Sequence, residues 1–212
     1  MPETPARTFE VRHVQVGRAL FAAVAAIMIT FSADHSAEVG LAVFSGWAVA
    51  TGLVLLLGAG LAHPRGRRAL PVLVGVLTML AGMIGGLPGI RSTTLFFALV
   101  ITWALATGIA EAAFGIRGLR TGVPDSRDAV LIGAFTIALG VGLLVVDPAY
   151  RLDYVIDGAG SFALTGIAIG VGIFGGYAAL VAVFLGIAGF SPKREPGAGP
   201  AQPTEQSVGE SA

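Results

Sequence analysis

One acidic residue, Glu111, lies well inside an apolar stretch that is long enough to cross a membrane. A carboxyl group at such a position is rare and typically acts as a proton relay or a cation ligand. At helical spacing Glu111 shares a face with the small residues Thr107, Gly108 and Gly115, so we expect it to point toward a closely packed helix. Glu111 and Thr107 are therefore our candidate intramembrane proton or ion site. The alternative is an interface residue that extends toward the membrane surface or pairs with Arg117, within two turns along the same helix.

The remaining side chains form no recognisable catalytic or metal-binding arrangement. The chain has no cysteine, which excludes disulfides, thiolate metal sites and cysteine nucleophiles. Its three histidines are scattered outside the apolar runs, and no phosphate-binding loop or Ser-His-Asp arrangement is present. The net charge is zero, so nothing indicates a nucleic-acid partner. We predict a non-enzymatic protein with no catalytic residue, no cofactor and no metal site.

The composition is typical of an integral membrane protein. Of the 212 residues, 55% are hydrophobic and only 12% are charged, whereas soluble domains carry about 25% charged residues. A transmembrane helix needs about 20 apolar residues, and we expect six such helices, at about 16–31, 40–62, 69–87, 94–115, 129–146 and 164–190. The prediction is an all-α integral membrane protein whose transmembrane domain (16–190) follows a cytoplasmic segment (1–15). A disordered cytoplasmic tail, poor in apolar residues, is expected at 191–212.

A short pattern recurs along the chain. The segment from Trp47 to Gly52, Trp-Ala-Val-Ala-Thr-Gly, returns from Trp103 to Gly108 as Trp-Ala-Leu-Ala-Thr-Gly. Self-similarity of this kind indicates a repeated structural unit. In the third copy we align Tyr177 with Trp103, because this register keeps an aromatic residue in place. The pattern predicts three helical hairpins, at about 16–62, 69–115 and 129–190, with these tryptophans and glycines as helix-packing residues.

The basic residues predict the orientation. Of the 13 Lys and Arg residues, all but Arg91 and Arg151 fall on one side of the six expected spans. Loops rich in Lys and Arg stay in the cytoplasm, so both termini are expected there. Arginine far outnumbers lysine amid abundant Ala and Gly, which is typical of a bacterial protein, and we place the chain in the bacterial cytoplasmic (inner) membrane. The longest connection, 149–161, is expected to lie on the opposite membrane surface as an amphipathic segment.

This layout resembles the HdeD-like acid-resistance membrane proteins, bacterial six-span chains built from short two-helix repeats. The resemblance is carried by the spacings from Gly75 to Gly82 and from Gly133 to Gly140, each G-x-x-T-x-x-x-G, by Asp147-Pro148, and by the two tryptophan segments. It covers about residues 14–194. The connection before the sixth span is longer than a tight repeat needs, and the first span lacks the glycine pattern. The resemblance implies a stress-linked inner-membrane protein and transfers no catalytic residue.

Two functional hypotheses follow. The first is a non-enzymatic, multi-pass inner-membrane protein of the HdeD-like type that supports resistance to acid or envelope stress. Its partners are then the lipid bilayer and copies of itself or another membrane protein. The alternative is a small proton- or cation-coupled transporter or channel that uses Glu111.

Overall fold

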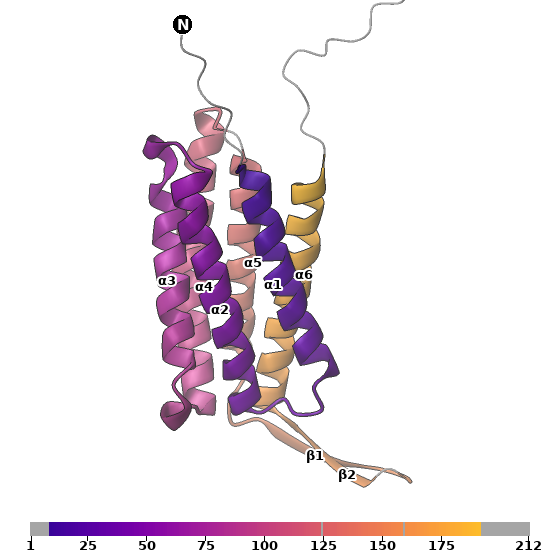
Figure 1. The fold of residues 1–212 in the computed structure, drawn as a ribbon. Helices are drawn as coiled ribbons and strands as arrows, with labels where there is room; N and C mark the ends of the chain where they lie inside the picture. Colours follow the sequence, from indigo (N-terminus) through magenta and orange to yellow (C-terminus); the bar gives the residue numbers. More distant parts are fainter. Residues whose placement is uncertain (1–8, 124, 159, 192–212) are drawn as a thin grey trace, which may run out of the picture.

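The computed structural model describes residues 9–123, 125–158 and 160–191. Within these residues the chain forms a bundle of six helices that run up and down side by side, with a two-stranded ribbon at one end (Figure 1). The helices are α1 (Val11–Phe31), α2 (Ala37–Leu61), α3 (Ala69–Gly85), α4 (Thr93–Arg120), α5 (Ser126–Val145) and α6 (Gly166–Phe190). The strands are β1 (Arg151–Ile156) and β2 (Gly160–Thr165), and short 3-10 turns form at Arg65–Arg67 (η1) and Pro88–Ile90 (η2).

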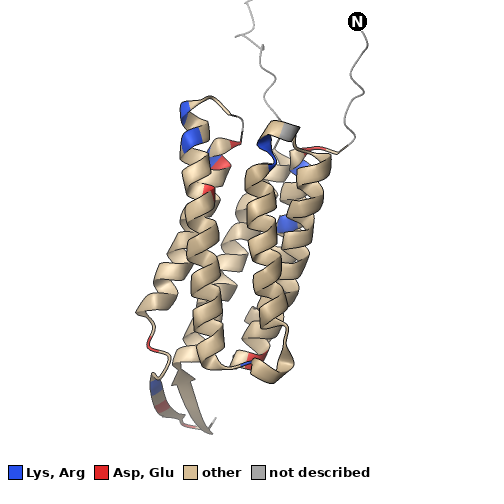
Figure 2. Cartoon of the chain, turned by 90° about the vertical axis from the view of Figure 1, so that its left-hand side faces the viewer, with Lys and Arg blue, Asp and Glu red and all other residues tan. Residues whose placement is uncertain are grey.

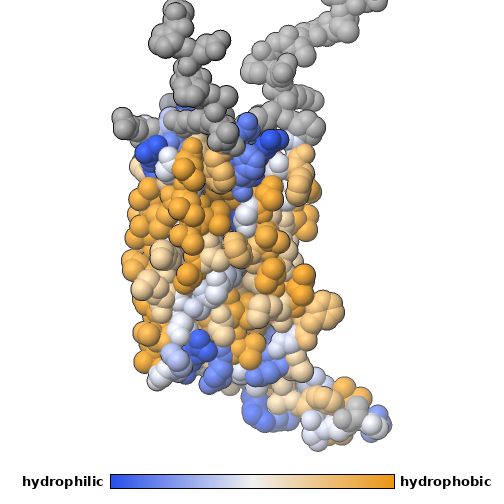
Figure 3. Space-filling model, in the orientation of Figure 1, coloured by the Kyte–Doolittle hydropathy of each residue, from blue (hydrophilic) through white to orange (hydrophobic). Residues whose placement is uncertain are grey.

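The bundle has the surface of a multi-pass membrane protein. Five helices, α1, α2, α4, α5 and α6, are long and apolar enough to cross a membrane, while α3 is apolar but has only 17 residues. Hydrophobic residues cover most of the visible flank between more polar ends (Figure 3). A helix satisfies its backbone hydrogen bonds internally, as a lipid environment requires. The expectation of several apolar helices long enough to span a membrane is confirmed for these five.

The even-numbered helices, α2, α4 and α6, begin with the same type of N-terminal cap. In each, the side-chain oxygen of the cap residue accepts a hydrogen bond from the backbone N–H three residues later, which satisfies one of the free donors of the first turn. The caps are Ser36 for α2, Ser92 for α4 and Thr165 for α6. These hydroxyl residues therefore fix where the chain turns back into the bundle.

Glycines determine which helices approach most closely. The most extensive contacts join α4 to α5, α1 to α6 and α2 to α3. A Cβ atom added at Gly52 would lie 2.9 Å from the backbone nitrogen of Met79 in α3, and one added at Gly108 would lie 2.9 Å from that of Ile137 in α5. Gly189 of α6 likewise lies against α1. The two repeat glycines are thus helix-packing residues, and their partners lie in the next predicted hairpin rather than in their own.

The segment between α5 and α6 departs from an all-helical fold. β1 and β2 pair antiparallel, with Leu152 opposite Leu164 and Tyr154 opposite Phe162. Glycines with positive φ, Gly158 and Gly160, occur where the ribbon turns, a conformation that other residues adopt rarely. The sequence predicts an amphipathic surface segment here in an all-α protein, followed by a span from about 164. Alternation of apolar and polar residues in β1 instead favours an extended conformation.

Some boundaries also differ from the expected ones. α1 begins at Val11 rather than near residue 16, so the polar turn before the apolar run is already helical. At its start the backbone N–H of Glu10 donates a hydrogen bond to Nδ1 of His13. α4 continues to Arg120, beyond the expected end at about 115. Of the expected N-terminal segment, residues 1–8 lie outside the described residues, as does the predicted tail except for Ser191.

Candidate functional site

Glu111 is buried in α4 and forms an ion pair with an arginine of another helix. Nη2 of Arg18 in α1 donates a hydrogen bond to Oε1 of Glu111 over 3.4 Å, and the two side chains are only 15% and 9% exposed. Arg117, the partner considered from the sequence, is exposed and lies further along α4. The buried carboxylate is therefore matched by the positive charge of an arginine 93 residues away in the sequence.

A second polar contact lies one turn along the same face of α1. Nε2 of Gln15 donates a hydrogen bond to Oδ2 of Asp128 in α5 over 3.0 Å. Gln15 and Arg18 are three residues apart, so both side chains leave α1 on one side. Together they connect α1 to α4 and α5. Sequence reasoning missed both contacts, that of Arg18 with Glu111 and that of Gln15 with Asp128. A glutamine and an arginine at helical spacing near the start of the first apolar run were a usable signal.

The ion pair lies at a pocket near the axis of the bundle. This pocket has a volume of about 120 Å³. Each helix contributes to its wall, with Arg18 from α1, Leu55 from α2, Val74 from α3, Glu111 from α4, Ile132 from α5 and Leu185 from α6. Gln15, Asp125 and Asp128 also line it, so its polar groups belong to the end of the bundle where α1 and α5 begin.

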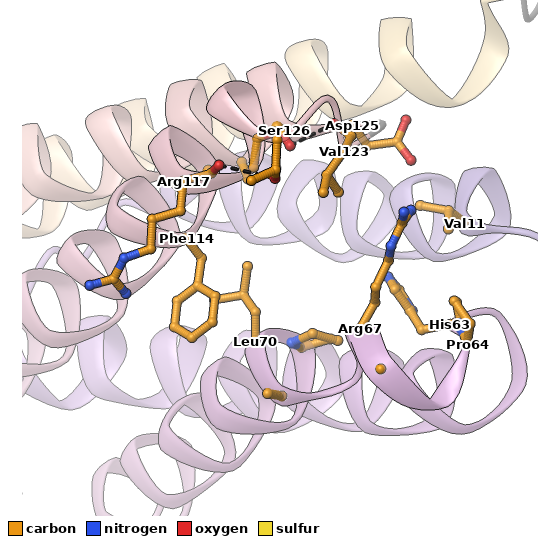
Figure 4. Close-up of a pocket in the computed structure, with 17 residues that line it drawn as sticks. Val11, His63, Pro64, Arg67, Leu70, Phe114, Arg117, Val123, Asp125 and Ser126 are labelled. Carbon is orange, nitrogen blue, oxygen red and sulfur yellow. Dashed lines mark hydrogen bonds between the residues drawn. The ribbon is translucent and has the colours of Figure 1, made fainter.

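A larger pocket of about 390 Å³ adjoins the first one. The two share several wall residues, including His63, Leu70 and Asp125. Figure 4 shows Leu70 of α3 and Phe114 of α4 next to each other in it, with His63 and Arg67 toward Val11. The central pocket therefore continues between α3 and α4 toward the flank of the bundle.

Aromatic rings close the core deeper in the bundle. The ring centroid of Trp47 in α2 lies 5.1 Å from that of Trp103 in α4, and the ring of Tyr177 in α6 lies 6.1 Å from Trp47 and 6.2 Å from Trp103. Phe44 packs edge-on against Trp103. Phe174 packs edge-on against Trp47 and is stacked with Tyr177. Trp47 and Trp103 are each only 6% exposed, so they fill space between helices and leave no open face for a ligand.

The aromatic trio carries three polar groups, two indole N–H groups and one hydroxyl, and two of the three have a hydrogen-bond partner. Nε1 of Trp103 donates to Oγ1 of Thr78 over 3.0 Å, and a hydrogen bond of 3.0 Å joins the hydroxyls of Tyr177 and Thr136. Nε1 of Trp47 has no partner among the described residues. Thr78 precedes Trp103 by 25 residues, and the residue at the same distance before Trp47 is Ala22, which carries no hydroxyl.

Thr107 does not line the pocket beside Glu111. Its Oγ1 donates to the carbonyl oxygen of Trp103, one turn earlier in α4, over 2.7 Å. This is the common behaviour of threonine in a membrane helix. The structure therefore brings Glu111 together with Arg18, while Thr107 is used within its own helix. Among the described residues no group of three or more His, Cys, Asp or Glu side chains is placed to hold a metal ion.

Comparison with known proteins adds no relative. No family model, no curated protein and no solved structure matches the chain. The resemblance to the HdeD-like proteins therefore depends on the sequence pattern alone.

Proposed function

We propose that the chain crosses the inner membrane of a bacterium six times, with both termini in the cytoplasm. The sixth span is α3, whose 17 residues measure about 25 Å at 1.5 Å per residue, slightly less than a hydrocarbon core of about 30 Å. Such a mismatch is accommodated by local thinning of the bilayer at modest cost. α3 also packs between α2 and α4, which are long enough to cross.

The distribution of arginines supports this orientation. Most of the Lys and Arg residues lie near one end of the bundle (Figure 2), where α1 begins and α6 ends. Arg91 and Arg151 lie in the connections at the other end. Cytoplasmic loops carry the excess of basic residues in membrane proteins, so the end with most arginines is the cytoplasmic one in this proposal.

The proposal includes three repeated hairpins, α1–α2, α3–α4 and α5–α6. The meeting of Trp47, Trp103 and Tyr177 supports it, because these residues correspond under the register taken from the sequence. The close pairs α2–α3, α4–α5 and α6–α1 also support it, since each joins one hairpin to the next around the bundle. The hydroxyl groups of Thr78 and Thr136 occupy matching positions beside Trp103 and Tyr177.

Within this frame the protein is a non-enzymatic membrane protein of the HdeD-like type that supports resistance to acid or envelope stress. The observation that carries this proposal is the pairing of Glu111 with Arg18. A carboxylate paired with a buried arginine from another helix holds the two helices together. A transport site instead needs a carboxylate that is free to bind and release the transported ion. The packed aromatic residues beyond the pair favour the same interpretation.

Survival of the host bacterium tests this function. A strain without the gene should survive an acid challenge less well than its parent, and the wild-type gene should restore survival. An Arg18→Met variant, which lacks the ion pair, should restore less, while an Arg117→Met variant should act like the wild type. Equal survival of the deletion strain and its parent under acid and under detergent stress would contradict the proposal.

One observation favours transport as a second candidate function. The central pocket has walls from all six helices and reaches Glu111 from the proposed cytoplasmic end. A proton or a cation that enters it would meet a carboxylate near the centre of the bundle, as in transporters with a site between repeats. Ion flux through the purified protein in liposomes, lost on Glu111→Gln, would replace the first proposal with this one.

A further inference from the structure

The ribbon of β1 and β2 is amphipathic. In a strand, successive side chains point to opposite faces, and directly opposite residues of the two strands share a face. The antiparallel register therefore gathers the apolar side chains on one face, with Leu152 opposite Leu164, Tyr154 opposite Phe162, and Ile156 opposite Gly160. The rings of Tyr154 and Phe162 stack with their centroids 5.9 Å apart. We name this set of residues the apolar face of the ribbon.

The opposite face carries polar groups. Arg151, Asp153, Ser161 and Thr165 lie on it, together with Ala163 and Val155. Nη2 of Arg151 donates a hydrogen bond to Oδ1 of Asp153 over 2.9 Å, and both side chains are more than 60% exposed. This face is therefore suited to water, and the ribbon presents different chemistry on its two sides.

No other part of the described chain covers the apolar face. Its five large side chains are each between 38% and 49% exposed, and the ribbon meets the bundle chiefly where β2 enters α6. A two-stranded hairpin alone in water is marginally stable at best, and it needs packing on a hydrophobic side to persist. The face thus requires an external partner.

The position of the ribbon indicates that partner. It leaves the bundle between the end of α5 and the start of α6 and runs obliquely to one side, beyond the outline of the helices (Figure 1). Exposed apolar side chains, such as those of Leu144 and Val145, continue from the base of the ribbon along the flank of the bundle. If the flank contacts lipid, the surface directly beside the ribbon is the surface of the bilayer.

We propose that the apolar face of the ribbon lies on the interfacial region of the outer leaflet and anchors the α5–α6 connection there. Tyrosine and phenylalanine at the level of the lipid headgroups bury their rings while polar groups remain in water. The Arg151–Asp153 pair then faces the solution. This inference rests on the proposed placement of the bundle across the membrane, and it adds a lipid contact outside the transmembrane helices.

The absence of cysteine from the sequence permits a direct test with single labels. Phe162→Cys and Ser161→Cys place the same environment-sensitive fluorophore on the apolar and the polar face of one strand. Each variant is purified as the full chain and placed in liposomes of phosphatidylcholine and phosphatidylglycerol, with nitroxide quenchers near the headgroups or deep in the acyl chains. We expect shifted emission and strong quenching by the shallow nitroxide for position 162, and at least a threefold weaker quenching for position 161.

A third label separates failure of this inference from failure of the membrane placement. Leu180→Cys lies near the middle of α6 on an exposed apolar position, so the deep nitroxide should quench it. Quenching at 180 with equal, weak quenching at 161 and 162 would overturn the lipid contact while leaving the placement intact. A shielded label at 162 that no lipid quencher reaches, and that becomes exposed on dilution of the protein, would assign the face to a second copy instead. No quenching at 180 would overturn the placement and the inference together.

Discussion

Replacement of Arg18 by methionine leaves the Glu111 carboxylate buried without its cationic partner. Removal of one member of a buried ion pair typically costs about 3–5 kcal/mol. The separation of 3.4 Å between Nη2 and Oε1 is long for a charged hydrogen bond, which places this pair at the low end, near 3 kcal/mol. We expect Arg18→Met and Glu111→Leu each to lower the free energy of unfolding by about that amount. Because an apolar pair of similar volume needs no charge compensation, the double variant should lie within about 1 kcal/mol of the wild type.

The two tryptophans provide the assay. Trp47 and Trp103 are each 6% exposed in the core, so unfolding of the purified protein by a denaturing detergent in mixed micelles should change their fluorescence. Arg117→Met, at an exposed position, is the matched control and should change the free energy of unfolding by no more than about 0.5 kcal/mol. If the double variant loses the sum of the two single effects, about 6 kcal/mol, the side chains are not coupled and the pairing is refuted.

The same unfolding assay tests the packing of the helices. Gly108→Ala should destabilise the protein by about 1–3 kcal/mol, because the added Cβ would meet backbone atoms of α5 at 2.9 Å. Gly172→Ala is the control and should be neutral, because an added Cβ there has nothing within 4 Å. Equal effects of the two substitutions would contradict the close contact. Thr78→Val should cost about 1–3 kcal/mol, because it leaves the buried indole N–H of Trp103 without an acceptor. Thr51→Val is its control, since that hydroxyl has no partner among the described residues, and a larger loss at 51 than at 78 would refute the hydrogen bond.

Length and hydrophobicity were sufficient to locate the helices. An apolar run near 20 residues has few alternatives to a membrane helix, and the expected runs at 40–62 and 94–115 overlap α2 and α4 closely. The glycines also indicated close packing correctly. They did not identify the neighbour, because any helix with small residues suits such a contact. The contact of Gly52 with α3 and the contact of α1 with α6 depend on how all six helices pack together.

The partner of Glu111 was harder to predict for the same reason. Arg18 lies near the start of the first span, where an arginine ordinarily extends to the membrane surface. Only the packing of α1 against the rest of the bundle brings its guanidinium to α4. The ribbon was missed because β1 has only six residues, and β2 belongs to an apolar stretch that continues into α6. A short apolar run does not distinguish a strand from the start of a helix.

The most direct measurement of the central proposal is ion flux after a pH step across liposomes that contain the purified protein. Wild type and Glu111→Gln are compared after tryptophan fluorescence has shown that both are folded. The pairing of Glu111 with Arg18 and the packed aromatic core predict that neither protein carries protons or cations above the level of empty liposomes. Flux through the wild type that disappears in Glu111→Gln would contradict this account and identify Glu111 as the residue that binds the transported ion.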